Sequence, residues 1–161
     1  MRAVLSIGSN MDDRRALLRG VRDEFAGEIT AASPVYSTPP WGVTDQDEFL
    51  NAVLIVEVAQ GPLELLRRGQ ALEEAAERVR VRRWGPRTLD VDVVTAWDPE
   101  ELHSDDPVLT LPHPHAHERA FVLVPWLAAD PSATLGGRRV ADLIAGLDPD
   151  EVAGIVEAGR L

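Results

Sequence analysis

The sequence predicts an α+β fold, in which one sheet packs against helices that do not alternate strictly with its strands. Strand-like apolar runs and two amphipathic helical patterns are segregated along the chain. The first predicted strand is followed by Gly8-Ser9-Asn10 and not by the Gly-rich turn of a doubly wound sheet. A length of 161 residues suits one compact domain, which we expect to span residues 1–161.

The N-terminal region predicts a strand followed by a helix. Arg2 to Gly8 is rich in apolar and β-branched residues and closes on glycine. Asn10 is the expected N-cap of a helix that ends at Gly27. The residues that mark this helix by their spacing are Leu17, Leu18, Val21 and Phe25.

The next region predicts two strands separated by a long loop. Ile29 to Tyr36 is a strand interrupted by Pro34, which indicates a sheet edge or a bulge. Phe49 to Val58 is the strongest strand pattern in the chain. The loop between them, Ser37 to Glu48, is long enough to predict a functional or mobile segment.

A second amphipathic helix is expected from Gly61-Pro62 onward, because proline suits a first helical position. Its spaced positions are Leu65, Gly69, Leu72, Ala76 and Val79. Glu64 with Arg68 and Glu74 with Arg78 form expected i, i+4 ion pairs on its solvent side. A loop over Arg80 to Pro86 then precedes a strand over Thr88 to Trp97.

The C-terminal third shows weaker patterns. Residues 98–106 are polar and turn-rich, and Leu109 to Leu111 is short and extended. Pro125 interrupts an apolar run over residues 121–127. A late helix is expected around Val140, Leu143, Ile144 and Leu147, and residues 151–157 suit either a helix or a strand.

Composition excludes several classes of protein. The 27 acidic against 16 basic residues give a net charge of −11, which disfavours binding to nucleic acid or anionic membrane. The absence of cysteine excludes disulfides, a thiolate nucleophile and cysteine-ligated metals, and the absence of lysine excludes a P-loop. No apolar run of about 18 residues and no signal-peptide pattern occurs, so we expect a cytoplasmic protein.

The strongest candidate for chemistry is the segment from Arg83 to Asp92. On a strand, Asp90 and Asp92 project from one face about 6.6 Å apart along the chain. Paired carboxylates repel unless a cation lies between them, and Mg²⁺ prefers such oxygen ligands together with water and phosphate. The arginines within ten positions, which pair well with phosphate, are Arg78, Arg80, Arg82, Arg83 and Arg87. The alternative is a solvated strand face beside a solvated arginine loop.

Three of the four histidines fall in the segment His113-Pro114-His115-Ala116-His117. Zinc ligation, polar lining of a phosphate site and plain loop histidines all remain open. Phe49 and Asn51 share a strand face and suit a flat heterocycle: the phenyl ring would stack on it, and the amide would hydrogen-bond to its edge. The alternative is that Phe49 belongs to the core, as Phe in a strand usually does. Gln70 and Glu73 face the arginine loop or solvent.

The chain resembles the 6-hydroxymethyl-7,8-dihydropterin pyrophosphokinase family of folate biosynthesis over roughly residues 2 to 130. The segment R-W-G-P-R-T-L-D-V-D-V-V carries the resemblance. The other motifs occur in family order: Ile7-Gly8-Ser9-Asn10, Ser37-Thr38-Pro39-Pro40-x-Gly42, Phe49-Leu50-Asn51-Ala52, Arg78-Val79-Arg80, Leu111-Pro112-His113 and Arg119-x-Phe121. The resemblance implies a ferredoxin-like fold with a mainly antiparallel sheet, and transfer of diphosphate from ATP to the pterin hydroxymethyl oxygen, leaving AMP.

The resemblance also implies roles for individual residues. Asp90 and Asp92 would hold two Mg²⁺ ions on the ATP triphosphate, with Arg78 and Arg87 neutralising the migrating group. The residues that would contact ATP or lie beside it are Gln70, Glu73, Arg80, Trp84, Thr110, His113 and Arg119. The residues that would bind the reduced pterin are Thr38, Pro40, Trp41, Phe49, Asn51 and Phe121. The sequence names no obvious general base, although Asp92 could accept the hydroxyl proton. The two loops, which bear Thr38 to Gly42 and Arg80 to Pro86, are expected to act as lids over the bound substrates.

Some positions depart from the family pattern. Val108 stands where some relatives carry a basic residue, Phe49 replaces a tyrosine of some members, and Trp41 is bulkier than the usual aliphatic residue. None of these changes removes a charge at the predicted metal site. We therefore expect an enzyme that acts on ATP and a reduced pterin as a monomer, without nucleic acid or membrane. The rival hypotheses are a non-catalytic pterin- or nucleotide-binding module and a zinc hydrolase built on the histidine run.

Overall fold

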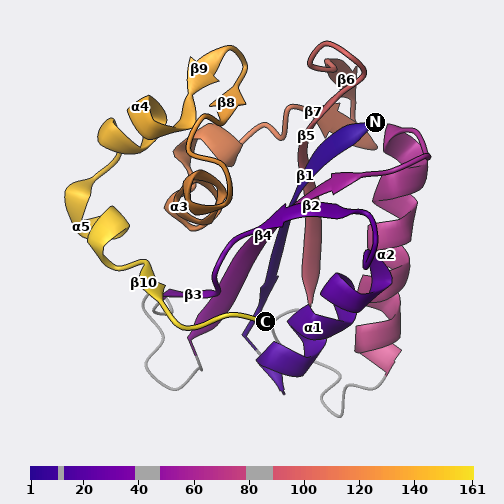
Figure 1. Ribbon diagram of the computed structural model, residues 1–161, viewed down its shortest axis with the longest axis horizontal. Helices are drawn as coiled ribbons and strands as arrows, with labels where there is room; N and C mark the ends of the chain where they lie inside the picture. Colours follow the sequence, from indigo (N-terminus) through magenta and orange to yellow (C-terminus); the bar gives the residue numbers. More distant parts are fainter. Residues whose placement is uncertain (11–12, 39–47, 79–88) are drawn as a thin grey trace.

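The computed structural model describes residues 1–10, 13–38, 48–78 and 89–161, and its centre is a six-stranded sheet (Figure 1). The strand order is β10-β3-β4-β1-β5, with β2 also paired to β4, and every pairing is antiparallel. The strands are β1 (Arg2–Ser9), β2 (Ile29–Ala32), β3 (Tyr36–Thr38), β4 (Phe49–Glu57), β5 (Asp90–Trp97) and β10 (Val156–Glu157). This sheet confirms the predicted α+β class.

Helices cover both faces of the sheet. Figure 1 shows α1 (Arg14–Glu24) and α2 (Pro62–Arg78) on one side, and α3 (Ala120–Ala129) with α4 (Val140–Ala145) on the other. The remaining elements are β6 (Ser104–Asp106), β7 (Leu109–Leu111), the 3₁₀ turn η1 (Ala116–Glu118), β8 (Thr134–Leu135), β9 (Arg138–Arg139) and α5 (Pro149–Ala153). Within the described part of the chain, no helix is long and apolar enough to cross a membrane.

Side chains alternate between two hydrophobic cores, one on each face of the sheet, as the strand period requires. The α1/α2 face buries Leu5, Ile7, Leu54, Val91 and Val93 with residues of both helices. The α3 face buries Val4, Val53, Ile55 and Val94 with Leu123 and Trp126. The odd positions of β1 therefore face α1 and α2, and the even positions face α3.

Two predictions for the N-terminal half need correction. The N-cap of α1 is Asp13, whose carboxylate accepts the backbone N–H of Ala16 at 3.1 Å, and not Asn10. The strand predicted over 29–36 divides into β2 and β3 around Pro34, as its interruption suggested. At this break the Ser33 hydroxyl accepts the Val53 N–H at 2.9 Å and donates to the Pro34 carbonyl at 2.7 Å, so the chain leaves the ladder with its polar groups paired.

Arg68 joins α2 to the end of α1 and does not pair with Glu64 as predicted. Its guanidinium donates to Glu24 at 3.0 Å and to the two carboxylate oxygens of Glu28 at 2.6 and 3.0 Å, and lies 4.1 Å from the ring centroid of Phe25. These hydrogen bonds lower the pKa of Glu28. Tertiary partners have therefore replaced the local i, i+4 pair.

The C-terminal segment closes the edge of the sheet beside β3. The residues that suited either a helix or a strand form both, because α5 ends at Ala153 and β10 follows. Next to β10, the Val35 N–H donates to the Gly159 carbonyl and the Ala158 N–H donates to the Val35 carbonyl, both at 2.7 Å. Arg15 of α1 donates to the Ala158 carbonyl. The tail thereby holds β3, the strand that carries Thr38, between β10 and β4.

Candidate active site

The α3 face of the sheet changes from apolar to polar at the same level in three neighbouring strands. One row pairs Val4 of β1 with Ile55 of β4. Four residues further along β1, Gly8 pairs with Asn51 on one side and with Asp90 on the other. The side chains therefore pass from a packed core under α3 to a polar surface within about 13 Å along the strands. This polar end is the candidate active site.

Asp90 and Asp92 lie on this face of β5, as the sequence predicted. Val91 lies between the two aspartates and Val93 follows Asp92, and both valines belong to the core of the opposite face. Asp92 pairs in register with Ser6, one step closer to the packed end than Asp90. The strand therefore presents two partly buried carboxylates in succession, and Asp90 already interacts with a neighbouring group.

Glu73 holds α2 against the start of β5. Its carboxylate accepts the Val91 N–H at 3.0 Å, between the two aspartates. This contact fixes the backbone that carries Asp90 and Asp92 relative to α2. Gln70, which the sequence places near it, is exposed on the same helix.

Gly8 provides the space that the Asn51 side chain occupies. A Cβ atom at Gly8 would lie 2.5 Å from Asn51 Oδ1, much closer than any ordinary contact. The amide nitrogen of Asn51 donates to the Thr38 hydroxyl at 3.5 Å, a long hydrogen bond. Asn51 is 6% exposed, so its side chain is buried, and the hydrogen bond to Thr38 orients its amide. The sequence motif contained Gly8 but did not indicate this role, which depends on the register of β1 and β4.

The aromatic residues at this end come from two elements. Phe49 opens β4, is partly buried and pairs with Thr38 of β3. Phe121 is in the first turn of α3 and packs against the second core. The Arg119 guanidinium lies 5.6 Å from its ring centroid, a cation–π contact. The two aromatic residues thus come from the start of β4 and from the start of α3.

His113 is tied to β5 beside the aspartates. The backbone N–H of His113 donates to the Val94 carbonyl at 2.7 Å. The ring nitrogen Nδ1 of His113 accepts the backbone N–H of His115 at 3.2 Å. With Nδ1 used as an acceptor, the neutral ring carries its proton on Nε2, which can donate to a ligand. Burial lowers the pKa of His113, and the Asp92 carboxylate opposes this shift.

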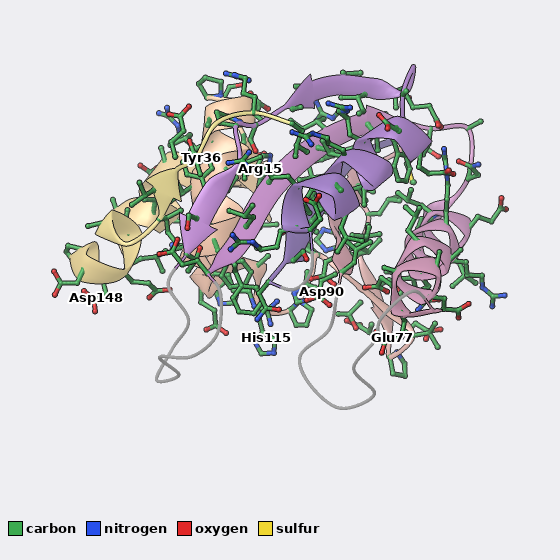
Figure 2. The ribbon with its side chains drawn as sticks, turned by 90° about the horizontal axis from the view of Figure 1, so that it is seen from below. Arg15, Tyr36, Glu77, Asp90, His115 and Asp148 are labelled. Carbon is green, nitrogen blue, oxygen red and sulfur yellow. The ribbon has the colours of Figure 1, made fainter. Side chains whose placement is uncertain are left out.

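His115 lies beside an acidic side chain of the following turn. Figure 2 shows it at the same end of the molecule as Asp90, and its Nδ1 lies 2.8 Å from the Glu118 carboxylate. Both residues are exposed. Among the residues that the structure describes, no group of three His, Asp or Glu side chains is placed to hold a metal.

The structure leaves other predicted residues untested. Thr110 is on β7, which packs against β5 and α2, and its hydroxyl donates to the Asp106 carbonyl at 3.1 Å. Arg78 ends α2, but its side chain lies outside the described part. The predicted residues that lie wholly outside it are Pro40, Trp41, Arg80, Trp84 and Arg87.

Comparisons with known proteins show the family to which the chain belongs. A family model for 7,8-dihydro-6-hydroxymethylpterin-pyrophosphokinase (HPPK) matches residues 4–131. The 2-amino-4-hydroxy-6-hydroxymethyldihydropteridine pyrophosphokinase of Mycobacterium tuberculosis is 50% identical over 159 residues, which cover 92% of this chain and 85% of that protein. The protein of the same name from Methylorubrum extorquens is 43% identical over 155 residues, covering 94% of this chain and 96% of that protein.

A solved structure agrees with the fold. Plasmodium falciparum HPPK-DHPS superposes with a TM-score of 0.62 at 13% identity, over 89% of this chain and 43% of that one. The chain thus spans less than half of that protein, and at this identity the likeness concerns the fold alone. It agrees with the ferredoxin-like architecture implied by the resemblance.

Proposed function

Since the chain belongs to the 7,8-dihydro-6-hydroxymethylpterin pyrophosphokinase family, we propose that it transfers diphosphate from ATP to 6-hydroxymethyl-7,8-dihydropterin, giving AMP and the pterin diphosphate. This reaction is a step of folate biosynthesis. The observation that carries the proposal is the row that pairs Asn51, Gly8 and Asp90. It places a residue suited to read a heterocycle two strands away from a pair of carboxylates suited to a magnesium-bound triphosphate.

The carboxylates fit magnesium. Asp90 and Asp92 offer only oxygen ligands, and Mg²⁺ is usually bound by one or two carboxylates and completed by water and substrate phosphate. We assign both residues to two Mg²⁺ ions. When bound, the metal neutralises charge on the transferring phosphoryl oxygens. In the free protein the two like charges are separated by one residue of β5, which favours binding of a cation between them.

The nucleotide side of the site is assigned to the surroundings of β5. The neutral His113 ring has an Nε2–H to donate to phosphate, and Arg119 supplies a positive charge. The assignment to ATP also includes Gln70, Glu73, Arg80, Trp84 and Thr110, and Arg78 and Arg87 are assigned to the migrating diphosphoryl group. Of these, Glu73 acts through the Val91 N–H and therefore positions the metal-binding strand.

The pterin side is assigned to β3, β4 and the start of α3. The rings of Phe49 and Phe121 would enclose the flat heterocycle, and the Asn51 amide would read its edge. Thr38 supports the Asn51 amide by the hydrogen bond between them. Pro40 and Trp41 are assigned to the same pocket.

The reaction follows from this placement. The pterin hydroxymethyl oxygen attacks the β-phosphorus of ATP, the bond from that phosphorus to the α,β-bridging oxygen breaks, and AMP leaves with the electron pair. The hydroxymethyl proton is lost, and Asp92 is the candidate acceptor. Transfer of this kind depends mainly on positioning and charge neutralisation, so a strong general base is not required.

A product assay tests the proposal. We expect AMP to form from ATP and Mg²⁺ only when the reduced 6-hydroxymethylpterin is present. Asp90→Ala should abolish AMP formation while pterin binding persists. Asp142→Ala, at an exposed position of α4, is the matched control with normal activity. Formation of ADP would indicate single-phosphoryl transfer. Pterin binding without any product would indicate a binding module.

The proposal extends to the state in which the protein works. We propose one domain over residues 1–161 that acts as a cytoplasmic monomer on its two small substrates, without nucleic acid. The net charge of −11 supports the absence of nucleic acid, and the lack of cysteine is in keeping with a reducing compartment. Sedimentation equilibrium of the purified protein measures its oligomeric state, and a dimer would contradict the monomer.

A further inference from the structure

Asn10 is a buried residue whose side-chain amide has no hydrogen-bond partner in the described part of the chain. The residue is 3% exposed, and both side-chain atoms, Oδ1 and Nδ2, lack a partner there. The capping of α1, which the sequence had assigned to Asn10, is done by Asp13. The local structure therefore does not account for an amide at this position.

Such an amide is costly in the free protein. A buried donor or acceptor that has exchanged water for no partner destabilises the folded state, and the large majority of buried side-chain polar atoms are hydrogen-bonded. By contrast, the buried Ser33 hydroxyl has both a donor and an acceptor as partners. The Asn10 amide is thus the kind of group that a bound molecule can satisfy.

The position of Asn10 indicates which molecule. Gly8 and Ser9 pair with Asn51 and Leu50. β1 ends at Ser9, and extending its register by one residue would bring Asn10 opposite Phe49. Because side chains alternate along a strand, continuing β1 by one residue puts Asn10 on the same face as Gly8. On that face Asn51 and Phe49 make up the pterin side of the proposed site.

We propose that the carboxamide of Asn10 binds the reduced pterin, as a second amide beside Asn51. A carboxamide offers one acceptor and one N–H donor side by side, which matches a donor–acceptor edge of the heterocycle. Neither Oδ1 nor Nδ2 of Asn10 has a hydrogen-bond partner within the described part of the chain. The inference rests on the proposed function, because it takes the reduced pterin as the ligand of this end of the sheet.

The test is the substitution Asn10→Leu, which keeps the approximate size and removes the amide. We expect the Kd for 6-hydroxymethyl-7,8-dihydropterin, measured by calorimetry with a non-hydrolysable ATP analogue present, to rise about 10- to 100-fold. The Kd of the ATP analogue alone should not change. The melting temperature of the free protein should stay the same or rise, because the amide that is removed has no partner to lose.

Ser33→Ala is the matched control, since it removes a buried polar group that has partners. It should lower the melting temperature and leave pterin affinity unchanged. Asn10→Asp, which keeps the shape and the acceptor oxygens but loses the N–H donor, tests the same hydrogen bond without an apolar side chain. It should also weaken pterin binding.

Two results would overturn the inference. One is wild-type pterin affinity in Asn10→Leu; the other is a fall in melting temperature with equal losses of pterin and ATP-analogue affinity, as expected for an amide with a structural role. AMP formation by the wild-type protein distinguishes failure of the Asn10 inference from failure of the proposed function. A protein that binds pterin but forms no AMP contradicts the function alone, and normal AMP formation with an unaffected Asn10→Leu contradicts the inference alone.

Discussion

The two faces of the central sheet are made by the same strands but are built for different tasks. The face under α1 and α2 is apolar along β4 and β5 and along β1 as far as Ile7. The face under α3 is apolar only over half its length, and then presents Gly8, Asn51, Asp90 and Asp92. The helices α1 and α2 bury the first face. The second face has polar side chains at one end, and we propose that these bind the substrates and the metal.

Each face also has one glycine where the backbone is closely approached. On the α1/α2 face, Gly69 of α2 lies against β5, and a Cβ there would be 3.0 Å from Val91 Cγ1. On the α3 face, a Cβ at Gly8 would be 2.5 Å from Asn51 Oδ1. The first glycine lets a helix approach the sheet, whereas the second makes room for an amide at the site. Stability and function are therefore expected to depend on different faces.

The largest effect is expected for Asp92→Asn. The amide keeps the size of the side chain but loses the charge that binds the metal, so AMP formation should fall on the order of 10³-fold, equivalent to several kcal/mol. The free energy of unfolding should stay the same or rise, since repulsion from Asp90 is removed. Steady-state kinetics and urea unfolding of the same variant measure both quantities. An active variant would remove Asp92 from the metal site.

Leu54→Ala tests the other face. Leu54 is fully buried in the middle of β4 under α1 and α2, so the cavity should lower the free energy of unfolding by about 2–5 kcal/mol. Below the unfolding transition, the variant should keep the wild-type KM values, because the site lies on the opposite face. Chemical denaturation and kinetics at low temperature check the two parts. A large rise in the KM for pterin would show that the faces are not independent.

The two glycines allow a direct comparison. Gly8→Ala displaces the Asn51 amide and should weaken pterin binding, with a loss of stability of about 1–3 kcal/mol from overpacking. Gly69→Ala should change stability by less than about 1 kcal/mol, because the helix propensity of alanine offsets the tight contact with Val91. Its pterin affinity should be that of the wild type. Calorimetry of pterin binding to both variants measures the difference. Equal losses of pterin affinity would contradict the proposal that function and stability depend on different faces.

The sequence predicted the strands that build the site because their patterns are local. Period-two alternation was enough to put Asp90 and Asp92 on one face of β5, and the apolar run over 49–58 was enough to define β4. The pairing of Gly8 with Asn51 and Asp90 was not accessible, because residues 8, 51 and 90 meet only through the strand order. The clearance for Asn51 follows from that order and from nothing near Gly8 in the sequence.

Other features were missed for separate physical reasons. The helix α3 is apolar on nearly all sides and contains Pro125, so it has no amphipathic stripe and reads as an interrupted apolar run. Asn10 and Asp13 are both good N-cap residues, and the cap is Asp13 because the helix starts at Arg14. The predicted Glu64–Arg68 pair ignored Glu24 and Glu28, which only the packing of α1 on α2 brings to Arg68. The missing information was tertiary for Arg68, whereas for α3 and for the N-cap the local pattern itself was ambiguous.

The smallest expected effect is a pH dependence confined to the α1/α2 side. Hydrogen bonds from Arg68 lower the pKa of Glu28 below its ordinary value of 4.5. The unfolded chain therefore binds more protons here as the pH falls, so the stabilisation is complete above about pH 5 and is lost as the pH falls through the folded-state pKa. For this partly exposed pair, we expect a contribution of about 1 kcal/mol or less.

Urea unfolding between about pH 3 and 6 measures this contribution, with Glu28→Gln compared with the wild type. The variant should be slightly less stable at pH 6 and should lose less stability on acidification. Glu64→Gln, exposed on the same helix as Arg68, should keep the wild-type slope. The free energy of unfolding of Glu28→Gln could instead depend on pH as steeply as that of the wild type. In that case the contacts of Arg68 with Glu28 do not stabilise the packing of α1 on α2. The stability of the α1/α2 side would then depend on its apolar packing alone.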